Sequence, residues 1–341
     1  MEERKHNKND LAQMQGLPLS LKIRLTQDRI KGWYDNFGGD VYVAVSGGKD
    51  SQVLADIVKQ MYPDVPLVFV DTGLEYNSVR NKGKQMDDEI LLPKMNFVDV
   101  VLKYGYPIIS KEIAQMLYEC QKRKLAGKPM PCYRYDKLMG TFIDKNTGKL
   151  SQYNITRYAY LLDAPFMISH KCCDVMKKSP SKSYEKKTGF KPFLGTLASD
   201  SRLRETKWFK FGCNAFEEKR PTSQPLSFWT EQDILHYIRE YDIDIADAYG
   251  QIVVDDKGQY ATTKEERTGC IFCLFGITKD PDRLLRLKEN DPMKYDFVMR
   301  GGKFGDNGMW IPAPDQNGKM GLGFKFVIDW LNEHGHMNIK Y

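Results

Sequence analysis

Long hydrophobic runs are absent from this chain of 341 residues. No stretch approaches the roughly 20 apolar residues that a membrane helix needs. The opening residues, 1–15, are polar and charged, and they lack the apolar centre of a secretory signal. We therefore expect a cytoplasmic protein without a membrane segment. Hydrophobic residues make up 41% of the chain and charged residues 28%, which argues for a folded protein rather than a disordered one.

Cysteine is sparse, and its count of seven is odd. An odd number in a long chain with no secretory signal argues against a disulfide framework and favours metal binding or catalysis. A large excess of one charge is missing as well, because the formal net charge is only +6. This mild basicity suits an anionic partner such as a nucleotide or a nucleic acid, and it suits an ordinary solvated surface equally well.

Alternating apolar patterns predict an α/β fold built on a parallel sheet. Two β-branched runs, 41–45 and 66–70, read as buried strands, and each is followed by apolar residues at helical spacing. A third apolar run near 97–102 continues the alternation of strands and helices. Helices are also predicted at 230–241, with Thr230 as the N-cap, and at 326–333.

These patterns divide the chain into three predicted regions. Residues 1–36 form an N-terminal helical segment, and residues 37–245 form a nucleotide-binding domain. Turn signals and basic residues indicate an insertion or a mobile loop around 120–165 within that domain. Residues 246–341 form a smaller, partly irregular C-terminal region, rich in glycine after Cys273.

The most specific local pattern is a glycine-rich turn between the first predicted strand and the helix that follows it. Its residues are Ser46, Gly47, Gly48, Lys49, Asp50 and Ser51. Two glycines allow a tight turn and a close approach of the backbone to a ligand. The N–H groups and the positive dipole end of the following helix favour an anion, and the lysine adds a charge. This combination suits a phosphate or a pyrophosphate.

The turn is not a Walker A loop, because Asp50 stands where serine or threonine is required. It resembles the PP-loop of ATP pyrophosphatases and of the phosphoadenosine phosphosulfate (PAPS) reductase family. The resemblance implies an adenine nucleotide alpha-hydrolase-like, Rossmann-like fold with helices flanking a parallel sheet. It also implies ATP or an adenylylsulfate-type nucleotide as ligand, Mg²⁺ as counter-ion, and Lys49, Asp50 and Arg204 as catalytic candidates.

Three further segments carry the same resemblance, which extends from about residue 41 to residue 273. Asp71, Thr72 and Gly73 end the second strand, in a region that faces the adenosine in the family. The stretch from Gly195 to Arg204 is similar to the family's Gly-x-x-Ala-x-Glu-Ser-x-x-Arg loop, with Asp200 in place of Glu. A guanidinium there can clamp phosphate or sulfate bidentately. The segment 224–234, with its Trp-Thr pair, resembles a structural motif.

Four cysteines resemble those of the family's iron–sulfur branch: Cys172, Cys173, Cys270 and Cys273. The resemblance implies a 4Fe-4S cluster on these thiolates. Four thiolates also make a structural zinc site, although an adjacent Cys-Cys pair is awkward for a zinc knuckle. Unrelated buried cysteines are the third reading.

One departure from the family concerns the nucleophile. The reductases place a catalytic cysteine in a C-terminal Glu-Cys-Gly-Leu-His tail, whereas no cysteine follows Cys273 in this sequence. A thiol could come from Cys213, Cys132 or Cys120. Cys213 is the first choice because Lys207, Lys210 and Lys219 lie near it in sequence and could lower its pKa. The alternative reading for each of the three is an inert structural cysteine.

Three functions are therefore expected, in this order. The first is an ATP pyrophosphatase that adenylates a substrate for sulfur transfer. A sulfur-donor protein such as a cysteine desulfurase would assist it, and nucleic acid would contact the basic regions 120–135 and 177–191. The second is an adenylylsulfate or phosphoadenylylsulfate reductase with a displaced cysteine. The third is a non-catalytic nucleotide-binding subunit. The acceptor substrate and the oligomeric state are not predicted.

Overall fold

The computed structural model describes residues 5–130 and 132–341, which group into two compact units. The first unit takes in the chain up to Pro93 together with Ser179–Cys270, and the second takes in Lys94–Lys178 and Ile271–Tyr341. The chain therefore leaves the first unit after Pro93, returns to it at Ser179 and leaves it again after Cys270. The boundaries predicted near residues 36 and 245 stay predictions.

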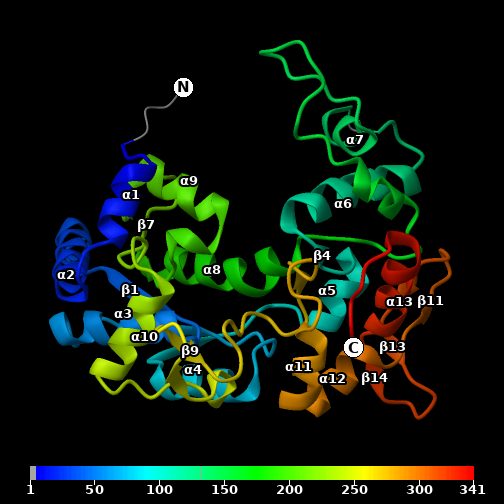
Figure 1. The fold of residues 1–341 in the computed structure, drawn as a ribbon. Helices are drawn as coiled ribbons and strands as arrows, with labels where there is room; N and C mark the ends of the chain where they lie inside the picture. The colour runs from blue at the N-terminus through cyan, green and yellow to red at the C-terminus, as the bar shows by residue number, and fades with distance from the viewer. Residues whose placement is uncertain (1–4, 131) are drawn as a thin grey trace. The chain divides into compact units, whose positions relative to one another are not determined.

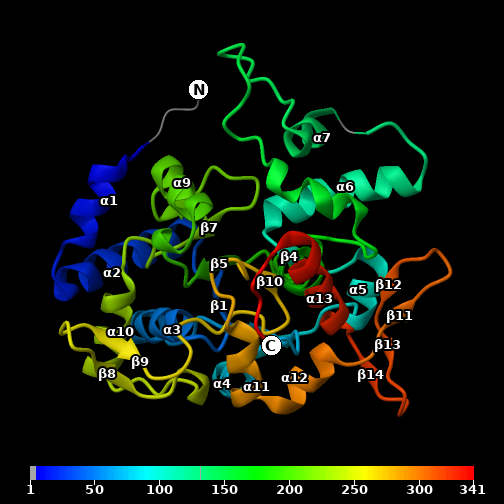
Figure 2. The ribbon, with the colours of Figure 1, turned by 45° about the vertical axis from the view of Figure 1, so that its right-hand side comes forward.

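A six-stranded sheet organises the first unit, in the order β3-β2-β1-β5-β7-β6. All neighbours are parallel except β6 and β7 at one edge, which are antiparallel. Within the sheet, Val43 lies beside Leu67 on one side and Phe193 on the other. The protein is thus of the α/β class, as the sequence predicts (Figures 1 and 2).

The strands and helices of the first unit have the following bounds: α1 Lys8–Gln15, α2 Leu19–Asn36, β1 Val41–Val45, α3 Lys49–Met61, β2 Leu67–Val70, α4 Asn77–Met86, β3 Glu89–Leu91, α8 Ser179–Thr188, β5 Lys191–Leu194, η3 Ala198–Asp200, α9 Arg202–Phe211, β6 Asn214–Ala215, β7 Thr222–Ser223, α10 Glu231–Glu240, η4 Asp247–Tyr249, β8 Ile252–Val254 and β9 Tyr260–Thr262. The predicted strand 41–45, the helix after it and the Thr230-capped helix are confirmed.

The prediction for residues 97–102 as a further strand is wrong, because they lie in helix α5, Phe97–Tyr104. Phe97, Val100 and Val101 are its buried residues, at the i, i+3, i+4 spacing of one helix face. Asn96 caps the helix by accepting the N–H of Asp99. The third strand is instead β3, which is short and partly exposed.

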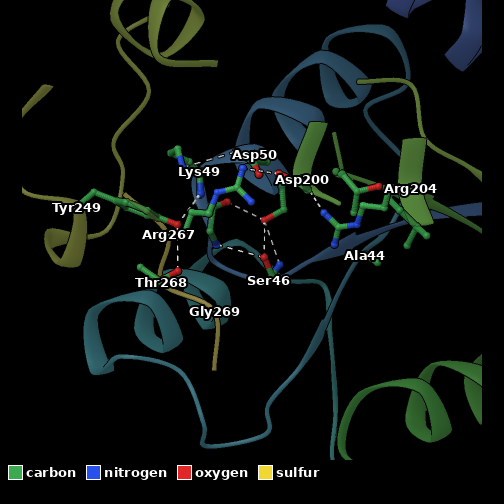
Figure 3. A pocket seen from close by; sticks show the side chains of 15 residues that line it. Ala44, Ser46, Lys49, Asp50, Asp200, Arg204, Tyr249, Arg267, Thr268 and Gly269 are labelled. Carbon is green, nitrogen blue, oxygen red and sulfur yellow. Dashed lines mark hydrogen bonds and ion pairs between the residues drawn. The ribbon is translucent and has the colours of Figure 1, made fainter. Parts of the chain in front are cut away.

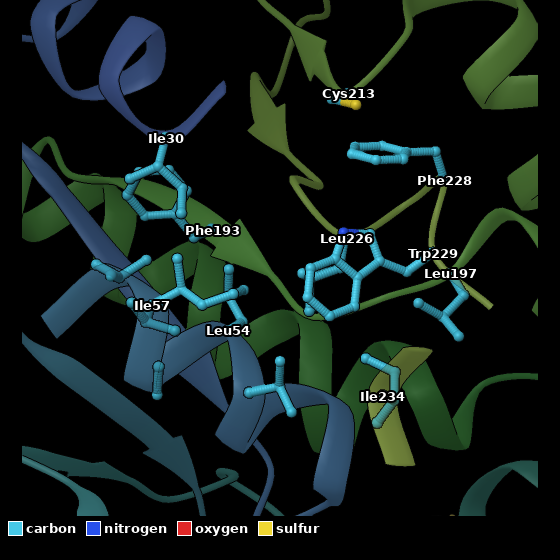
Figure 4. Packing of buried hydrophobic residues seen from close by; sticks show 14 of the residues in the cluster. Ile30, Leu54, Ile57, Phe193, Leu197, Cys213, Leu226, Phe228, Trp229 and Ile234 are labelled. Atoms are coloured by element: carbon cyan, nitrogen blue, oxygen red, sulfur yellow. The ribbon is translucent and has the colours of Figure 1, made fainter. Parts of the chain in front are cut away.

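The main core lies on one face of the sheet, between alternate strand residues and helices α2, α3 and α10. Val41, Val43 and Val45 point into it, whereas Tyr42 packs on the other face with Tyr184 of α8. Trp229 is fully buried at its centre (Figure 4). Its indole N–H donates to the hydroxyl of Thr26, 2.9 Å away, which fixes α2 against the segment before α10.

Thr26→Val should therefore destabilise the protein without changing the volume of the core. The replacement leaves the buried indole N–H of Trp229 without an acceptor, and an unsatisfied buried donor costs about 1–3 kcal/mol. Urea denaturation should show that loss in the free energy of unfolding. Thr206→Val on exposed α9 is the matched control, expected to change stability by less than about 0.5 kcal/mol. Equal effects of the two substitutions would contradict this role for Thr26.

The second unit is mostly helical, with short two-stranded pairings. Its elements are α5 Phe97–Tyr104, β4 Ile108–Ile109, α6 Lys111–Leu125, α7 Cys132–Met139, η1 Thr156–Asp163, η2 Asp174–Lys178, β10 Leu274–Phe275, α11 Arg283–Asn290, α12 Pro292–Met299, β11 Lys303–Phe304, β12 Trp310–Ile311, β13 Ala313–Pro314, β14 Met320–Gly321 and α13 Phe324–Gly335. The helix predicted at 326–333 is confirmed as α13, and helices α6, α7 and η1 occupy much of the segment 120–165.

None of the helices in the part of the chain that the structure describes is both long enough and apolar enough to cross a membrane.

Candidate functional site

The glycine-rich turn, residues 46–51 and hereafter the PP-loop, joins the end of β1 to the start of α3. Gly47 has φ +72°, and a methyl group added there would come within 2.0 Å of the carbonyl oxygen of Val79 on α4. A methyl group at Gly195 would come within 2.9 Å of the backbone of Asp50 and Ser51. Both positions therefore require glycine, because neighbouring backbone leaves no room for a side chain. The close contact at Gly195 brings the β5–α9 loop against the PP-loop.

Hydroxyl groups hold the PP-loop in shape. Ser51 donates to the carbonyl oxygen of Gly48 at 2.8 Å, and its oxygen accepts the N–H of Ser46 at 3.1 Å. The N–H of Lys49 donates to the hydroxyl of Tyr249 at 3.3 Å. Gly48, the N-cap of α3, lines the pocket together with Asp50 and Ser51 of the first turn, so the positive end of that helix borders the pocket.

A pocket of about 330 Å³ lies over the PP-loop (Figure 3). Its lining combines the PP-loop, the β5–α9 loop and a segment just before Cys270: Ala44, Ser46, Gly48, Lys49, Asp50, Ser51, Leu194, Gly195, Thr196, Asp200, Arg204, Tyr249, Arg267, Thr268 and Gly269. Three cations and several hydroxyl groups thus border one cavity.

Lys49 is the most buried of the three cations, with its side chain only 3% exposed. Its ammonium lies 2.8 Å from a carboxylate oxygen of Glu231 and donates to the carbonyl oxygen of Glu266 at 2.7 Å. Burial alone would lower the pKa of Lys49, but the nearby carboxylates, Asp50 first, raise it. The side chain therefore carries a full positive charge into the pocket.

The carboxyl group of Asp50 lies in an environment that disfavours its charged form. Burial raises the pKa of its carboxyl to about 6, against the attraction of Lys49 and with further repulsion from Glu231 and Asp200. Its Oδ1 is buried and has no hydrogen-bond partner among the described residues. Perturbed carboxyl groups of this kind gather at functional sites.

Asp200 organises the two arginines of the pocket. It forms an ion pair with Arg204 one helical turn along the chain, and its other oxygen lies 2.7 Å from a guanidinium nitrogen of Arg267. The arginine side chains stay 42% and 56% exposed, so their remaining N–H groups are open to a ligand (Figure 3). Asp200, which stands where the family has Glu, thus holds the guanidinium groups of Arg204 and Arg267 at the pocket.

The structure brings most of the predicted nucleotide-binding residues together and leaves a few apart. Asp71, Thr72 and Gly73 do not line this pocket. Although burial raises the pKa of the Asp71 carboxyl, hydrogen bonds from Arg80 and Lys84 outweigh it and bring the pKa down to about 2. The Arg80 contacts measure 2.6 and 2.8 Å. In this structure Asp71 thus anchors α4, and its contact with a nucleotide stays a prediction.

Sequence reasoning missed Tyr249, Arg267 and Thr268. Their hydroxyl groups and guanidinium line the pocket although they lie about 200 residues from the PP-loop in the chain. Tyr249 and Thr268 share a hydrogen bond of 3.1 Å beneath Lys49. The sequence offers only a weak signal for them, the Arg-Thr-Gly that precedes Cys270.

The expectation that neighbouring lysines activate Cys213 is wrong. The residue is only 6% exposed, and burial raises the pKa of its thiol. Lys207 points instead to Glu218 and Thr222, at 2.6 and 2.8 Å. Burial likewise raises the pKa of Cys120 to about 11. The side chain of Cys132 lies outside the described residues.

Cys172 and Cys173 in the second unit have properties suited to a metal site. Their sulfur atoms lie 4.0 Å apart. The hydrogen bond with Cys172 and the charges of Lys111 and Lys177 outweigh burial and lower the pKa of the Cys173 thiol to about 6. Thiolates are the form that binds metals. Across residues 5–130 and 132–341, no group of three or more His, Cys, Asp or Glu side chains is arranged to hold a metal ion. The four-cysteine set with Cys270 and Cys273 stays a prediction.

Comparison with known proteins gives concordant matches. The model of the phosphoadenosine phosphosulfate reductase domain matches residues 40–144 and 144–273. An adenosine 5'-phosphosulfate reductase of Halalkalibacterium halodurans is 23% identical over 127 residues, which are 35% of this chain and 54% of that enzyme. One from Staphylococcus epidermidis is 26% identical over 96 residues, which are 26% of this chain and 40% of that enzyme. The chain thus spans about half the length of these curated relatives.

Among solved structures, a phosphoadenylyl-sulfate reductase from Candida auris in a phosphate complex aligns with 77% of this chain and 97% of its own. The sequence identity is 14% and the TM-score 0.38.

Proposed function

The chain belongs to the phosphoadenosine phosphosulfate reductase domain family, and we propose that its PP-loop pocket binds an adenine nucleotide by its anionic end. The observation that carries the proposal is the convergence of Lys49, Arg204 and Arg267 with the N-terminus of α3 on one cavity. Charged donors and a helix N-terminus are the groups that bind phosphate and sulfate. The matched relatives are adenosine 5'-phosphosulfate reductases, which favours a sulfonucleotide as the ligand.

The reaction proposed for a bound sulfonucleotide is reduction of its sulfate to sulfite. A thiolate attacks the sulfur, the bond from sulfur to the nucleotide oxygen breaks, and AMP or its 3'-phosphate leaves. A second thiol then forms a disulfide with the first and releases sulfite, which accounts for both electrons. No cysteine is among the described residues lining the pocket. The proposal therefore requires thiols from another segment or from a dithiol partner, while Lys49 and the arginines hold the sulfonucleotide.

Adenylation of a substrate by ATP is the second candidate, favoured by the buried, high-pKa thiol of Cys213. In this reaction a nucleophile attacks the α-phosphorus and pyrophosphate leaves, so the nucleotide step needs no thiol. Lys49 and the arginines would hold the β- and γ-phosphates, and Asp50 offers a carboxylate to Mg²⁺ above pH 6. Sulfur would come from a donor protein such as a cysteine desulfurase.

We also propose that Cys172, Cys173, Cys270 and Cys273 hold a 4Fe-4S cluster, with zinc as the alternative metal. The support is the close Cys172–Cys173 pair with its stabilised thiolate. The cluster, when bound, would supply electrons. About four iron atoms per chain, lost in Cys172→Ser, would support the cluster; stoichiometric zinc or no metal would contradict it.

An anaerobic assay on the full chain separates the candidate reactions. The protein is incubated with adenosine 5'-phosphosulfate plus a dithiol, and separately with ATP and Mg²⁺, and sulfite and pyrophosphate are measured. Sulfite supports the reductase, and pyrophosphate supports the adenylating enzyme. Arg267→Ala should reduce either rate at least about 10-fold, the value of one charged hydrogen bond. Arg202→Ala, on the exposed start of α9, is the matched control. Nucleotide binding without either product would support a non-catalytic subunit, and absence of binding would contradict the proposed pocket.

A further inference from the structure

Positive charge is concentrated in one segment of the second unit, residues 122–157, hereafter the basic segment. It contains nine lysines and arginines and two aspartates, a net charge of +7 against +6 for the whole chain. The rest of the protein is therefore close to neutral. Seven of the nine cations have exposed side chains: Lys122, Arg123, Lys124, Lys128, Lys145, Lys149 and Arg157. Within the described residues only Lys124 of these seven forms an ion pair, with Asp163.

Local hydrogen bonds give the backbone that carries these charges a defined structure. The last turn of α6 carries three consecutive cations, 122–124, and Arg123 donates to the carbonyl oxygen of Pro129 at 2.9 Å. After α7 the chain forms a tight turn in which Asp144 accepts the N–H groups of Asn146 and Thr147. The flanking residues pair as an antiparallel bridge. Figures 1 and 2 show this loop beyond α7, on the side of α6 away from β4. Lys145 and Lys149, which lie on this loop, are both exposed.

Exposed aromatic rings accompany the charges. Tyr133 is 53% exposed and Tyr153 is 49% exposed. Both pack against the buried ammonium of Lys137, whose nitrogen lies 4.7 Å and 5.9 Å from their ring centres. Contact with Lys137 holds the rings in place while their remaining surface faces solvent. The other basic run, 177–191, differs because its Tyr184 is buried.

We propose that the basic segment binds single-stranded nucleic acid. Exposed lysines and arginines neutralise phosphates, and fixed aromatic rings stack on unpaired bases, which is how single strands are held without sequence-specific contacts. Unpaired bases are required because a duplex hides its base faces from Tyr133 and Tyr153. No residue of the basic segment is among the described residues that line the nucleotide pocket. The inference goes beyond the proposed nucleotide site and holds whichever reaction that site performs.

The test is fluorescence anisotropy of a labelled 30-nucleotide single strand, in RNA and DNA forms, with the full-length protein. We expect binding at 50 mM KCl with a Kd below about 10 µM. The logarithm of the association constant should fall with the logarithm of the salt concentration, with a slope of about 0.7 for each phosphate contact. Lys145→Glu/Lys149→Glu should weaken binding at least about 10-fold and lower that slope by about 1.4. The matched control, Lys303→Glu/Lys319→Glu, makes the same charge change on exposed lysines of the same unit. It should weaken the binding of the single strand by less than about 3-fold.

The role of the rings is tested separately. Tyr133→Leu/Tyr153→Leu should weaken binding about 5- to 100-fold, whereas Tyr133→Phe/Tyr153→Phe, which keeps both rings, should stay within about 2-fold of the unchanged protein. Equal losses in both lysine variants would overturn the assignment to this segment. Equal affinity for a duplex of the same sequence, tighter binding to phosphatidylserine vesicles, or no binding at 50 mM KCl would overturn the proposed ligand. Unchanged nucleotide affinity in these variants would show that the pocket is intact.

Discussion

Replacing Lys49 with alanine is expected to weaken the binding of adenosine 5'-phosphosulfate and ATP about 100-fold. The ammonium is nearly buried and stays charged because Asp50 and Glu231 raise its pKa. Its loss removes one charge-assisted hydrogen bond, worth about 1.5–3 kcal/mol. It also leaves the carboxylate of Asp50, which lines the pocket, close to the anionic end of the ligand without the neighbouring ammonium. Since 1.4 kcal/mol corresponds to a factor of ten, the two effects together account for the expected change.

Isothermal titration calorimetry measures this loss directly. Lys59→Ala is the matched control, because Lys59 lies at the other end of the same helix and pairs with Asp88 at 3.3 Å. Lys49→Met, which retains most of the side-chain volume, separates lost charge from lost packing and should weaken binding as much as the alanine variant. A loss below about 3-fold in a folded Lys49 variant would exclude Lys49 as a main contact to the ligand.

Asp50→Asn is expected to stabilise the protein at pH 7.5 by about 2–3 kcal/mol. Burial raises the pKa of the Asp50 carboxyl from 3.8 to about 6, and each pKa unit corresponds to 1.36 kcal/mol. The folded state holds this proton more tightly than the unfolded state does. Its contribution to stability is therefore fully present below pH 3.8 and is lost as the pH rises through 6. Asparagine is neutral, so the variant avoids the cost of burying a charged carboxylate above pH 6.

The gain in the free energy of unfolding should therefore shrink between pH 6 and pH 4. Urea denaturation of both proteins at several pH values tests this, with Asp64→Asn as the matched control on an exposed carboxyl of the same unit. A gain of the same size at pH 3.8 and pH 7.5, or no gain at all, would contradict the assigned environment of Asp50. If Asp50 also binds Mg²⁺, the stabilised variant should lose activity, as expected for a residue kept for function.

The sequence predicts those parts of the fold and site that depend on short segments. The run 41–45, the two glycines and Lys49 to Ser51 specify a strand, a turn and a helix start within eleven residues, and the structure has them there. Thr230 caps α10 as expected because its capping box with Asp233 is also local. Residues 97–102 misled because a short apolar run suits a strand and a buried helix equally.

Long-range contacts could not be predicted from the sequence. Arg267 forms an ion pair with Asp200 at the pocket, although the two residues lie 67 positions apart in the sequence. No local sequence pattern predicts this pair. The prediction of an activated thiol at Cys213 rested on lysines that are close in sequence. It fails because Lys207 pairs with Glu218 rather than with the thiol. Asp71 follows a strand, as nucleotide ligands often do, yet Arg80 and Lys84 neutralise it. Only the packing of α4 shows which partner it has.

The measurement that tests the nucleotide pocket most directly is equilibrium binding of adenosine 5'-phosphosulfate and of AMP to the unchanged protein. The two ligands share the nucleoside and differ at the end that the PP-loop cations would hold. We predict that the sulfonucleotide binds at least about 10-fold more tightly, one charged hydrogen bond or more. Equal affinities, or no binding of either, would contradict an anionic end held by Lys49, Arg204 and Arg267.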